Sequence, residues 1–288
     1  MIEIDIVKKL HGVEKDMLLK VDIQIEDESF IAISGVSGSG KTTLLRILAG
    51  LETAEGYIKV DGEVWLDTHS FKPIQQREIG FVFQDYALFP NMTVEEHLLF
   101  VKKDKKLALE LLEMTGLDAL AKRKPFTLSG GQQQRVNLCR AMMRGPKVLL
   151  MDEPLSALDI AMRLKLQNEI KALHERFKTT TLMVSHDPSE IYHMAKRVIV
   201  LKSGKIVDDG MPKEVLLKTS GSAKFSFEGR IIDIVQADVV YIAIIAIGQQ
   251  LTEIVVTPEE IQDMTIGQKV SISTKAFSPL VQYHYRTN

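Results

Sequence analysis

A glycine-rich octet between an apolar run and a helical segment constrains the fold more than any other feature of this sequence. Residues 30–34 (FIAIS) predict a buried strand, the octet GVSGSGKT fills residues 35–42, and residues 43–49 (TLLRILA) have helical character. In a strand–loop–helix succession of this kind, backbone N–H groups turn inward around a phosphate and the helix N-terminus adds positive potential. The order therefore predicts an α/β fold built around a phosphate-binding loop.

The octet also supplies side chains suited to a nucleotide and a metal ion. We expect Lys41 to reach the β and γ phosphates of ATP and the Thr42 hydroxyl to meet Mg²⁺. The residues expected to surround the phosphates are Gly35, Val36, Ser37, Gly38, Ser39, Gly40, Lys41, Thr42 and Thr43.

An acidic pair follows a second apolar strand about a hundred residues later. Residues 147–151 (KVLLM) predict a buried parallel strand that ends in Asp152 and Glu153. The segment resembles a Walker B strand, which implies that Asp152 holds Mg²⁺ and that Glu153 polarises the attacking water as a general base. An acidic turn that only caps the strand is the structural alternative.

Three more polar residues follow strands or begin a helix. His186 follows the β-branched strand 179–185, and Gln84 ends the run 79–84, so both are expected at the carboxyl edge of the sheet. Asp159 precedes a helical pattern over 160–177 and is a candidate N-cap. Leu166, Ile170, Leu173 and Phe177 recur at helical spacing and are expected in the core.

The octet LSGGQQQR at residues 128–135 connects these elements to one superfamily. Its place between a phosphate-binding loop and an acidic strand end resembles the ATP-binding cassette ATPases. The resemblance implies that Ser129, Gly130 and Gly131 close on the γ phosphate held by the opposite chain, in a homodimer with two composite ATP sites.

The same resemblance gives roles to the isolated polar residues. Gln84 is implied as a ligand of Mg²⁺ and the attacking water, Asp159 as part of a loop that crosses the dimer interface, and His186 as a sensor of the γ phosphate. Cassette ATPases commonly stack an aromatic side chain on adenine, but residues 1–29 contain no Phe, Tyr or Trp. His11 occupies the matching place, either as a stacking imidazole or as an ordinary turn residue.

The chain is long enough for two domains. We expect a nucleotide-binding domain over 1–219, with a mixed sheet and a helical subdomain over about 85–140, and a small OB-like all-β barrel over 220–288. The tail resembles the molybdate-binding barrel of molybdate importers, although Lys224, Phe225 and Phe277 depart from that pattern. Ser222, Lys224 and Lys275 are candidates for oxyanion binding, and a barrel that only aids dimerisation is the alternative.

Composition limits the partners. The formal net charge of −2 does not favour nucleic acid, and the single cysteine, Cys139, is expected to be buried and reduced. No secretory signal is visible in the first residues, so we do not expect export, and the longest apolar run, 239–247, is too short to span a bilayer. Any membrane role is therefore expected to come through a partner.

Together these resemblances imply the ATPase subunit of an importer that energises oxyanion uptake through a separate permease, with molybdate or tungstate as the first candidates for the oxyanion. A substrate-binding protein outside the membrane would take part indirectly, and the ATPase would lie at the cytoplasmic face of the inner membrane. The alternatives are an importer of sulfate, iron, sugars or polyamines, or a soluble regulatory protein whose tail senses a ligand.

Overall fold

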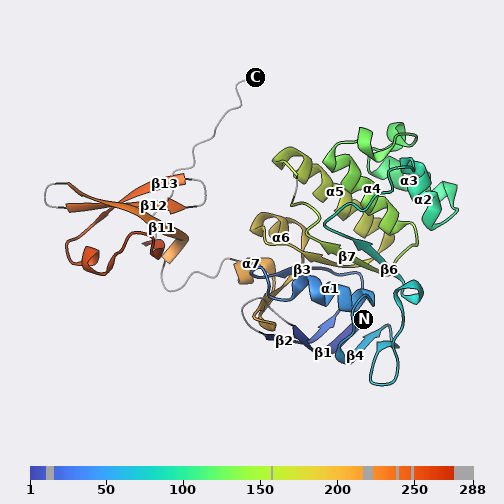
Figure 1. Cartoon of the computed structure of the whole chain (residues 1–288), viewed down its shortest axis with the longest axis horizontal. Coiled ribbons are helices and arrows are strands. Elements are labelled where there is room, and N and C mark those ends of the chain that lie inside the picture. The colour runs from blue at the N-terminus through green and yellow to red at the C-terminus, as the bar shows by residue number, and fades with distance from the viewer. Residues whose placement is uncertain (11–15, 157, 217–222, 238–239, 248–249, 276–288) are drawn as a thin grey trace. The chain divides into compact units, whose positions relative to one another are not determined.

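Two compact units, Met1–Leu216 and Leu217–Asn288, make up the chain, and each contains its own sheet (Figure 1). The computed structural model describes residues 1–10, 16–156, 158–216, 223–237, 240–247 and 250–275. The first unit carries a ten-stranded mixed sheet with the order β5-β4-β1-β2-β10-β9-β3-β8-β7-β6. The predicted α/β class is confirmed for this unit.

Five neighbouring strands form the parallel part of this sheet, and they are β9 (Arg197–Lys202), β3 (Phe30–Ser34), β8 (Thr180–Val184), β7 (Val148–Asp152) and β6 (Ile79–Val82). Every residue of β7 and β8 is buried. Strands covered on both faces are apolar almost throughout, as these two are. Their shared direction brings their carboxyl ends to one edge of the sheet.

The alternation of side chains along β3 separates two hydrophobic clusters. Phe30 and Ala32 pack into the cluster that contains α4 (Gly130–Met142) and α5 (Ile160–Phe177). Ile31 and Ile33 pack into the other cluster, which contains α1 (Lys41–Ala49). Because successive side chains of a strand point to opposite faces, one short strand joins both cores. The helices accordingly lie on both faces of the parallel strands (Figure 1).

The rest of the sheet is mainly antiparallel and comprises β1 (Ile2–Leu10), β2 (Met17–Ile25), β4 (Glu55–Val60), β5 (Glu63–Leu66) and β10 (Lys205–Gly210). Only the short pairing of β10 with β2 is parallel among these described strands. Ile2, Ile4 and Ile6 are buried on one face of β1 while the residues between them are half-buried. This pattern is typical of a sheet with one covered face.

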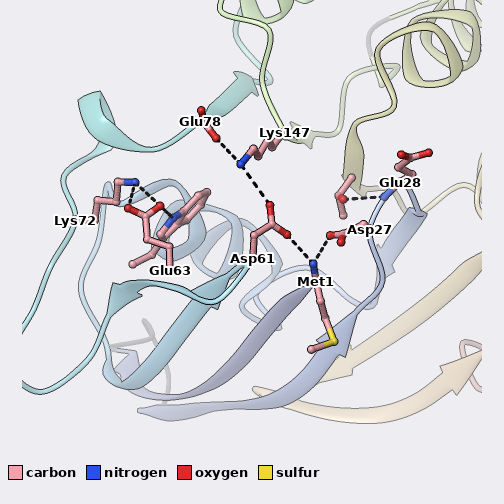
Figure 2. A network of polar contacts seen from close by, with 10 residues as sticks. Met1, Asp27, Glu28, Asp61, Glu63, Lys72, Glu78 and Lys147 are labelled. Carbon is pink, nitrogen blue, oxygen red and sulfur yellow. Dashed lines mark hydrogen bonds and ion pairs between the residues drawn. The ribbon is translucent and has the colours of Figure 1, made fainter.

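A set of polar contacts ties the antiparallel strands to the start of β7. Asp61 accepts a hydrogen bond from the amino group of Met1 at 2.8 Å, and Lys147 Nζ lies 3.5 Å from Asp61 Oδ2 (Figure 2). Lys147 Nζ also lies 3.0 Å from Glu78 Oε2, just before β6. Because these side chains are largely exposed, each pair contributes only about 0–1 kcal/mol. The network connects the turn between β4 and β5 to the start of β7, although these strands are not neighbours in the sheet.

The segment between β6 and β7 is mainly helical. It contains α2 (Val94–Val101), α3 (Lys105–Met114) and α4, together with two short 3-10 helices, η2 (Asp118–Leu120) and η3 (Pro125–Thr127). Thr93 and Glu96 form a capping box at the start of α2, which satisfies N–H groups that the helix leaves unpaired. A third 3-10 helix, η1 (Ile74–Gln76), lies before β6, and α6 (Pro188–Met194) and α7 (Pro212–Leu216) follow β8 and β10.

Helix α5 begins and ends where the sequence pattern predicts. Asp159 caps it, with Oδ1 accepting a hydrogen bond from the Met162 N–H at 2.9 Å. Leu166, Ile170 and Leu173 are at most 1% exposed, so their predicted place in the core is confirmed.

The second unit is an antiparallel sheet with the order β13-β12-β11-β14. Its strands are β11 (Ala223–Ala237), β12 (Val240–Ile247), β13 (Gln250–Val256) and β14 (Lys269–Lys275), and η4 (Glu260–Asp263) lies between the last two. Ile231, Ala243, Ile245 and Val256 form its small core. The described residues of this unit form four strands and one short 3-10 helix, in agreement with the predicted small β domain, and closure into an OB-like barrel stays a prediction.

Among the described residues, no helix combines the length and the apolar character that crossing a bilayer requires.

Candidate functional site

A pocket of about 690 Å³ lies over the glycine-rich loop at the carboxyl edge of the parallel strands. It brings together the loop before α1, the residue that follows β7, and residues of β1 and β2. The lining residues are Lys8, Lys9, Leu10, Met17, Ser37, Gly38, Gly40, Lys41, Thr42, Thr43 and Glu153.

Positive φ angles at three positions explain why this loop is rich in glycine. Gly35, Gly38 and Gly40 have φ values of 138°, 76° and 100°. A Cβ atom on Gly35 would lie 2.0 Å from the carbonyl oxygen of Leu201, which no relaxation of a flexible side chain could relieve. The loop therefore curls tightly against β9 and presents its N–H groups at the start of α1.

Lys41 is held inside this curl. Its Nζ donates hydrogen bonds to the carbonyl oxygens of Gly35 at 2.7 Å and Val36 at 3.0 Å, and the residue is only 7% exposed. Burial lowers the pKa of Lys41, while the charges of Glu153 and Asp152 oppose that shift. A cation in this position suits a phosphate chain placed over the loop.

Thr42 and Asp152 meet across 110 residues of sequence. The Thr42 hydroxyl donates a hydrogen bond to Asp152 Oδ1 at 3.1 Å. Burial raises the pKa of Asp152, and the hydrogen bond from Thr42 opposes that shift. A hydroxyl and a carboxylate are hard oxygen donors of the kind that Mg²⁺ binds, together with water and phosphate oxygens. These two residues therefore fit a magnesium ion shared with a nucleotide.

Glu153 and His186 form the second half of the site. Glu153 has φ of 45°, in the left-handed region, and its N–H donates to the Val184 carbonyl oxygen at 3.2 Å. This geometry turns the chain sharply at the end of β7. His186 Nδ1 lies 3.5 Å from Glu153 Oε1, and the His186 side chain is 66% exposed. The two side chains thus stand next to each other, although only Glu153 lines the pocket over the glycine-rich loop.

The octet at residues 128–135, called the signature segment from here on, lies outside this pocket. Ser129 caps α4, with its Oγ accepting from the Gln132 N–H at 3.3 Å while the Gln132 side chain accepts from the Ser129 N–H at 2.9 Å. Gly131 is buried against Met162, where an added Cβ would lie 2.9 Å from the sulfur atom. Neither Ser129, Gly130 nor Gly131 is among the residues that line the pocket.

The fold and these motifs match known proteins. A family model described as ABC transporter matches residues 18–156. The sulfate/thiosulfate import ATP-binding protein CysA of Bacillus cereus is 40% identical over 243 residues, which are 80% of this chain and 67% of that protein. The chain belongs to the ABC transporter family. Its predicted identity as a cassette ATPase domain is confirmed at that level.

Two other comparisons refine this assignment. The spermidine/putrescine import ATP-binding protein PotA of Mannheimia succiniciproducens is 42% identical over 239 residues, 80% of this chain and 63% of that protein. The chain therefore spans less than two thirds of the length of this relative. A dimeric structure of the ATP-binding cassette MJ0796 bound to ADP and Pi matches with a TM-score of 0.63 and 34% identity, over 74% of this chain and 99% of that one.

Three predicted site residues remain, and the structure tests their predicted roles to different degrees. They are Gln84, Asp159 and His11. Gln84 is exposed just after β6 and does not line the pocket. Asp159 is exposed at the start of α5, where the N-cap role is observed. His11 lies outside the described residues, so its stacking role stays a prediction.

The candidate oxyanion residues are only partly described. Ser222 lies outside the described residues. Lys224 and Lys275 belong to the paired strands β11 and β14, near the Ala223–Lys275 pair, but their side chains also lie outside the described part. Their predicted function stays a prediction.

Sequence reasoning missed residues that link the Gln84 segment to the signature helix of this ABC protein. Arg140 donates to the carbonyl oxygens of Ala87 at 2.6 Å and Tyr86 at 3.2 Å, and Asn137 donates to that of Phe83 at 3.2 Å. The only signal in the sequence was a polar Asn137 among apolar neighbours in α4. All three hydrogen bonds connect α4 to backbone atoms more than fifty residues away, which local patterns do not encode.

Proposed function

We propose that this chain is the ATP-hydrolysing subunit of an ABC importer that acts with a separate permease. The observation that carries the proposal is the shared position of Lys41, Thr42 and Glu153 on one pocket, with Asp152 bonded to Thr42 and His186 beside Glu153. A protein that only senses nucleotide does not require a carboxylate such as Glu153 in the pocket, where it can accept a proton from water.

Each of these residues has a distinct part in hydrolysis. Loop N–H groups and Lys41 hold the phosphates, and Thr42 and Asp152 would hold Mg²⁺, which neutralises charge on the phosphate oxygens. Glu153 accepts a proton from the attacking water as general base. His186, next to Glu153, donates a hydrogen bond toward the γ phosphate in this proposal.

The position of Ser129 supports a composite site. Because Ser129 and Gly131 do not line the pocket of their own chain, an isologous dimer is the arrangement in which they can act on a nucleotide. The matching cassette MJ0796 is described as dimeric and bound to ADP and Pi. We propose a homodimer with two ATP molecules at its interface.

The importer assignment rests on the names of the relatives and on the resemblance of residues 220–288 to a molybdate-binding barrel. The matching proteins are named as import ATP-binding proteins for spermidine/putrescine and for sulfate/thiosulfate. Neither name mentions molybdate, but the sulfate/thiosulfate name agrees with an oxyanion. We therefore propose oxyanion uptake, with molybdate, tungstate and sulfate as candidates and a polyamine as the competing cargo. The chain would then lie at the cytoplasmic face of the membrane, bound to its permease.

Replacing the general base tests the hydrolytic proposal. We expect Glu153→Gln to lower kcat for ATP hydrolysis by roughly 10²- to 10⁴-fold. The variant should still bind ATP and accumulate as an ATP-dependent dimer in size-exclusion chromatography. Glu113→Gln, on the exposed face of α3, is the matched control and should behave as the wild type. Undiminished hydrolysis by Glu153→Gln would contradict the assignment.

Mixed dimers test the composite site. Ser129→Asp keeps a residue that caps helices well and places a negative charge against the phosphates. Each of Ser129→Asp and Lys41→Ala should be inactive alone. Mixing the two should restore ATPase activity in proportion to the mixed dimers, because one site in each then combines an intact loop with an intact signature segment. A self-contained site predicts no recovery beyond the average of the two variants.

Calorimetric titration of the full chain tests the cargo. Heat of binding with molybdate, tungstate or sulfate that disappears in Lys224→Ala or Lys275→Ala would support an oxyanion site in the second unit. Spermidine, a cation, serves as the opposite control. An absence of heat with all three anions would contradict an oxyanion site in the second unit and would leave the ATPase proposal intact.

A further inference from the structure

A small polar cavity lies behind the candidate catalytic pair, and the proposed mechanism does not use it. Its volume is about 50 Å³, close to the space of one or two water molecules. Glu153 and His186 form one side of it. The other side includes Ser156, Arg163, Asp187 and Glu190.

Arg163, in the first turn of α5, contacts three groups around this cavity. Its Nη1 donates to Asp187 Oδ2 at 2.8 Å, and its Nε lies 3.4 Å from Glu190 Oε1. Its Nη2 donates to the Leu158 carbonyl oxygen at 3.3 Å. A planar guanidinium with several fixed donors can span groups on different segments in this way, whereas an ammonium cannot hold the same geometry.

Two of these contacts fix the chain on both sides of His186. Asp187 Oδ1 caps α6 by accepting from the N–H groups of Ser189 at 2.8 Å and Glu190 at 3.3 Å, which leaves Oδ2 for Arg163. Glu190 Oε2 accepts from the Ser185 hydroxyl at 2.6 Å, and the same Ser185 oxygen accepts from the Asp187 N–H at 3.1 Å. His186 therefore projects from a backbone that is held immediately before and after it.

The third contact reaches the segment that follows Glu153. Leu158, whose carbonyl oxygen accepts from Arg163, lies five residues after Glu153, and the Ser156 hydroxyl donates to the Glu153 carbonyl oxygen at 3.1 Å. One side chain thus joins the loop of Glu153 to the loop of His186. The 3.5 Å separation of these two side chains depends on how the loops are held together.

Charge and burial make Arg163 hard to replace at this point. The Glu190 side chain is 6% exposed, and burial raises its pKa while the charge of Arg163 opposes that shift. Among the residues that line the cavity, Arg163 supplies the permanent positive charge beside the carboxylates of Asp187 and Glu190. Loss of this charge leaves the buried carboxylate of Glu190 and the half-buried carboxylate of Asp187 without the cation that they share.

We propose that Arg163 is a positioning residue, which sets the His186 loop against Glu153 through Asp187 and Glu190 and couples both to the segment at Leu158. The inference rests on the proposed function, because it assumes that Glu153 and His186 act in ATP hydrolysis. Arg163 does not line the pocket over the glycine-rich loop, and we assign it no catalytic role of its own.

The first test separates positioning from folding. Arg163→Gln should lower kcat by roughly 100-fold, the scale of a displacement of about 1 Å in a catalytic group, with little change in ATP affinity measured with a fluorescent nucleotide. Arg163→Lys should recover part of kcat, since it keeps the charge but cannot span all three partners. Arg176→Gln is the control on the same helix, because its ion pair with Glu110 is largely exposed, and it should keep wild-type kinetics. If Arg163→Gln does not fold, the near-isosteric Asp187→Asn, which can still cap α6, replaces it.

The second test asks whether Arg163 acts through His186. His186→Ala should lose activity, and Arg163→Gln added to it should cost little more, because residues that act as one unit are not additive. Wild-type kcat in Arg163→Gln, or a double variant whose loss equals the product of the single losses, overturns the inference alone. Full activity in His186→Ala overturns the role given to His186 in the proposed function, and the inference with it.

Discussion

Arg135 and Glu169 form an ion pair inside the first unit, with Nε 2.6 Å from Oε2 and both side chains 9% exposed. Arg135 belongs to α4, which begins at the signature residues, and Glu169 belongs to α5, which begins at Asp159. Burial raises the pKa of Glu169, and the hydrogen bond from Arg135 opposes that shift. The pair therefore connects α4 to α5, and the N-caps of these helices, Ser129 and Asp159, are both proposed to lie at the dimer interface.

Removing one partner of this pair should be costly. Glu169→Leu leaves a buried guanidinium without its carboxylate, so we expect the free energy of unfolding to fall by about 3–5 kcal/mol in urea denaturation. Arg135→Met combined with Glu169→Leu should recover part of that loss, because neither charge then remains buried alone. Glu110→Gln breaks an exposed pair and should cost at most about 1 kcal/mol. Equal losses in the Glu169 and Glu110 variants would contradict this account.

Arg77 should stabilise α1, the helix that follows the phosphate loop, about as strongly as the Arg135–Glu169 pair stabilises α4 and α5. It is fully buried and donates to the carbonyl oxygens of Ile47 at 2.9 Å and Leu48 at 2.6 Å, at the end of α1, and to that of Trp65 at 3.0 Å. Burial lowers the pKa of Arg77 to about 10, so the guanidinium stays charged at neutral pH.

Arg77→Met should leave these carbonyl groups without a donor. We expect a loss of about 3 kcal/mol or more in unfolding free energy, since each buried unsatisfied polar group costs about 1–3 kcal/mol. Nucleotide affinity should fall as well, because α1 carries Lys41 and Thr42. Arg144→Met is the control, as Arg144 is exposed and donates only to the carbonyl oxygen of Gln75 at 2.8 Å. A melting temperature unchanged by Arg77→Met would show that the carbonyl groups find other partners.

The sequence predicted those parts of the fold that depend on neighbours along the chain. The strand before the phosphate loop and helix 160–177 follow from apolar periodicity and from the capping residue Asp159. The meeting of Thr42 with Asp152, and of Glu153 with His186, was foreseeable because parallel strands end at one edge of a sheet.

The contacts of Arg77 and Arg163 could not be predicted in this way. Arg77 follows two glutamines and looks like a surface residue, yet it is fully buried and donates to backbone carbonyl groups at residues 47–48, 65 and 72. Arg163 lies on the polar side of a helix pattern, and only the approach of α6 gives it carboxylate partners. Local propensity carries no information about which backbone or carboxylate oxygens a folded chain brings to an arginine.

His174 should make stability depend on pH. It is 9% exposed, with Nδ1 3.0 Å from Thr181 Oγ1 and its ring edge-on to Phe30. Burial lowers the pKa of His174 below its ordinary value of 6.5. The unfolded chain therefore binds a proton first as pH falls, so this histidine contributes a loss of stability that begins near pH 6.5 and continues down to the lowered pKa.

Urea denaturation of the wild type and His174→Gln at pH 7.5 and 5.0 checks this sign. The wild type should lose more unfolding free energy between the two values than the variant does. The quantity to compare is the difference between the loss in the wild type and the loss in the variant. Burial also lowers the pKa of His97 and raises that of Glu169, and both groups are present in both proteins. His69→Gln, at an exposed loop position, should keep the wild-type loss. A variant that loses as much stability as the wild type would contradict the assignment.

Cys139 should report on opening of the core between α3 and α4. The residue is fully buried, its sulfur lies 3.2 Å from the Thr115 hydroxyl, and burial raises the pKa of its thiol to about 12. Only the thiolate attacks a disulfide reagent, so the folded chain should react with Ellman's reagent at pH 8 at least 100-fold more slowly than the unfolded chain. Because the sequence holds one cysteine, the reaction follows a single site. Glu169→Leu should speed the reaction if it loosens α4 from α5, and rapid stoichiometric labelling of the folded wild type would show that this thiol is accessible.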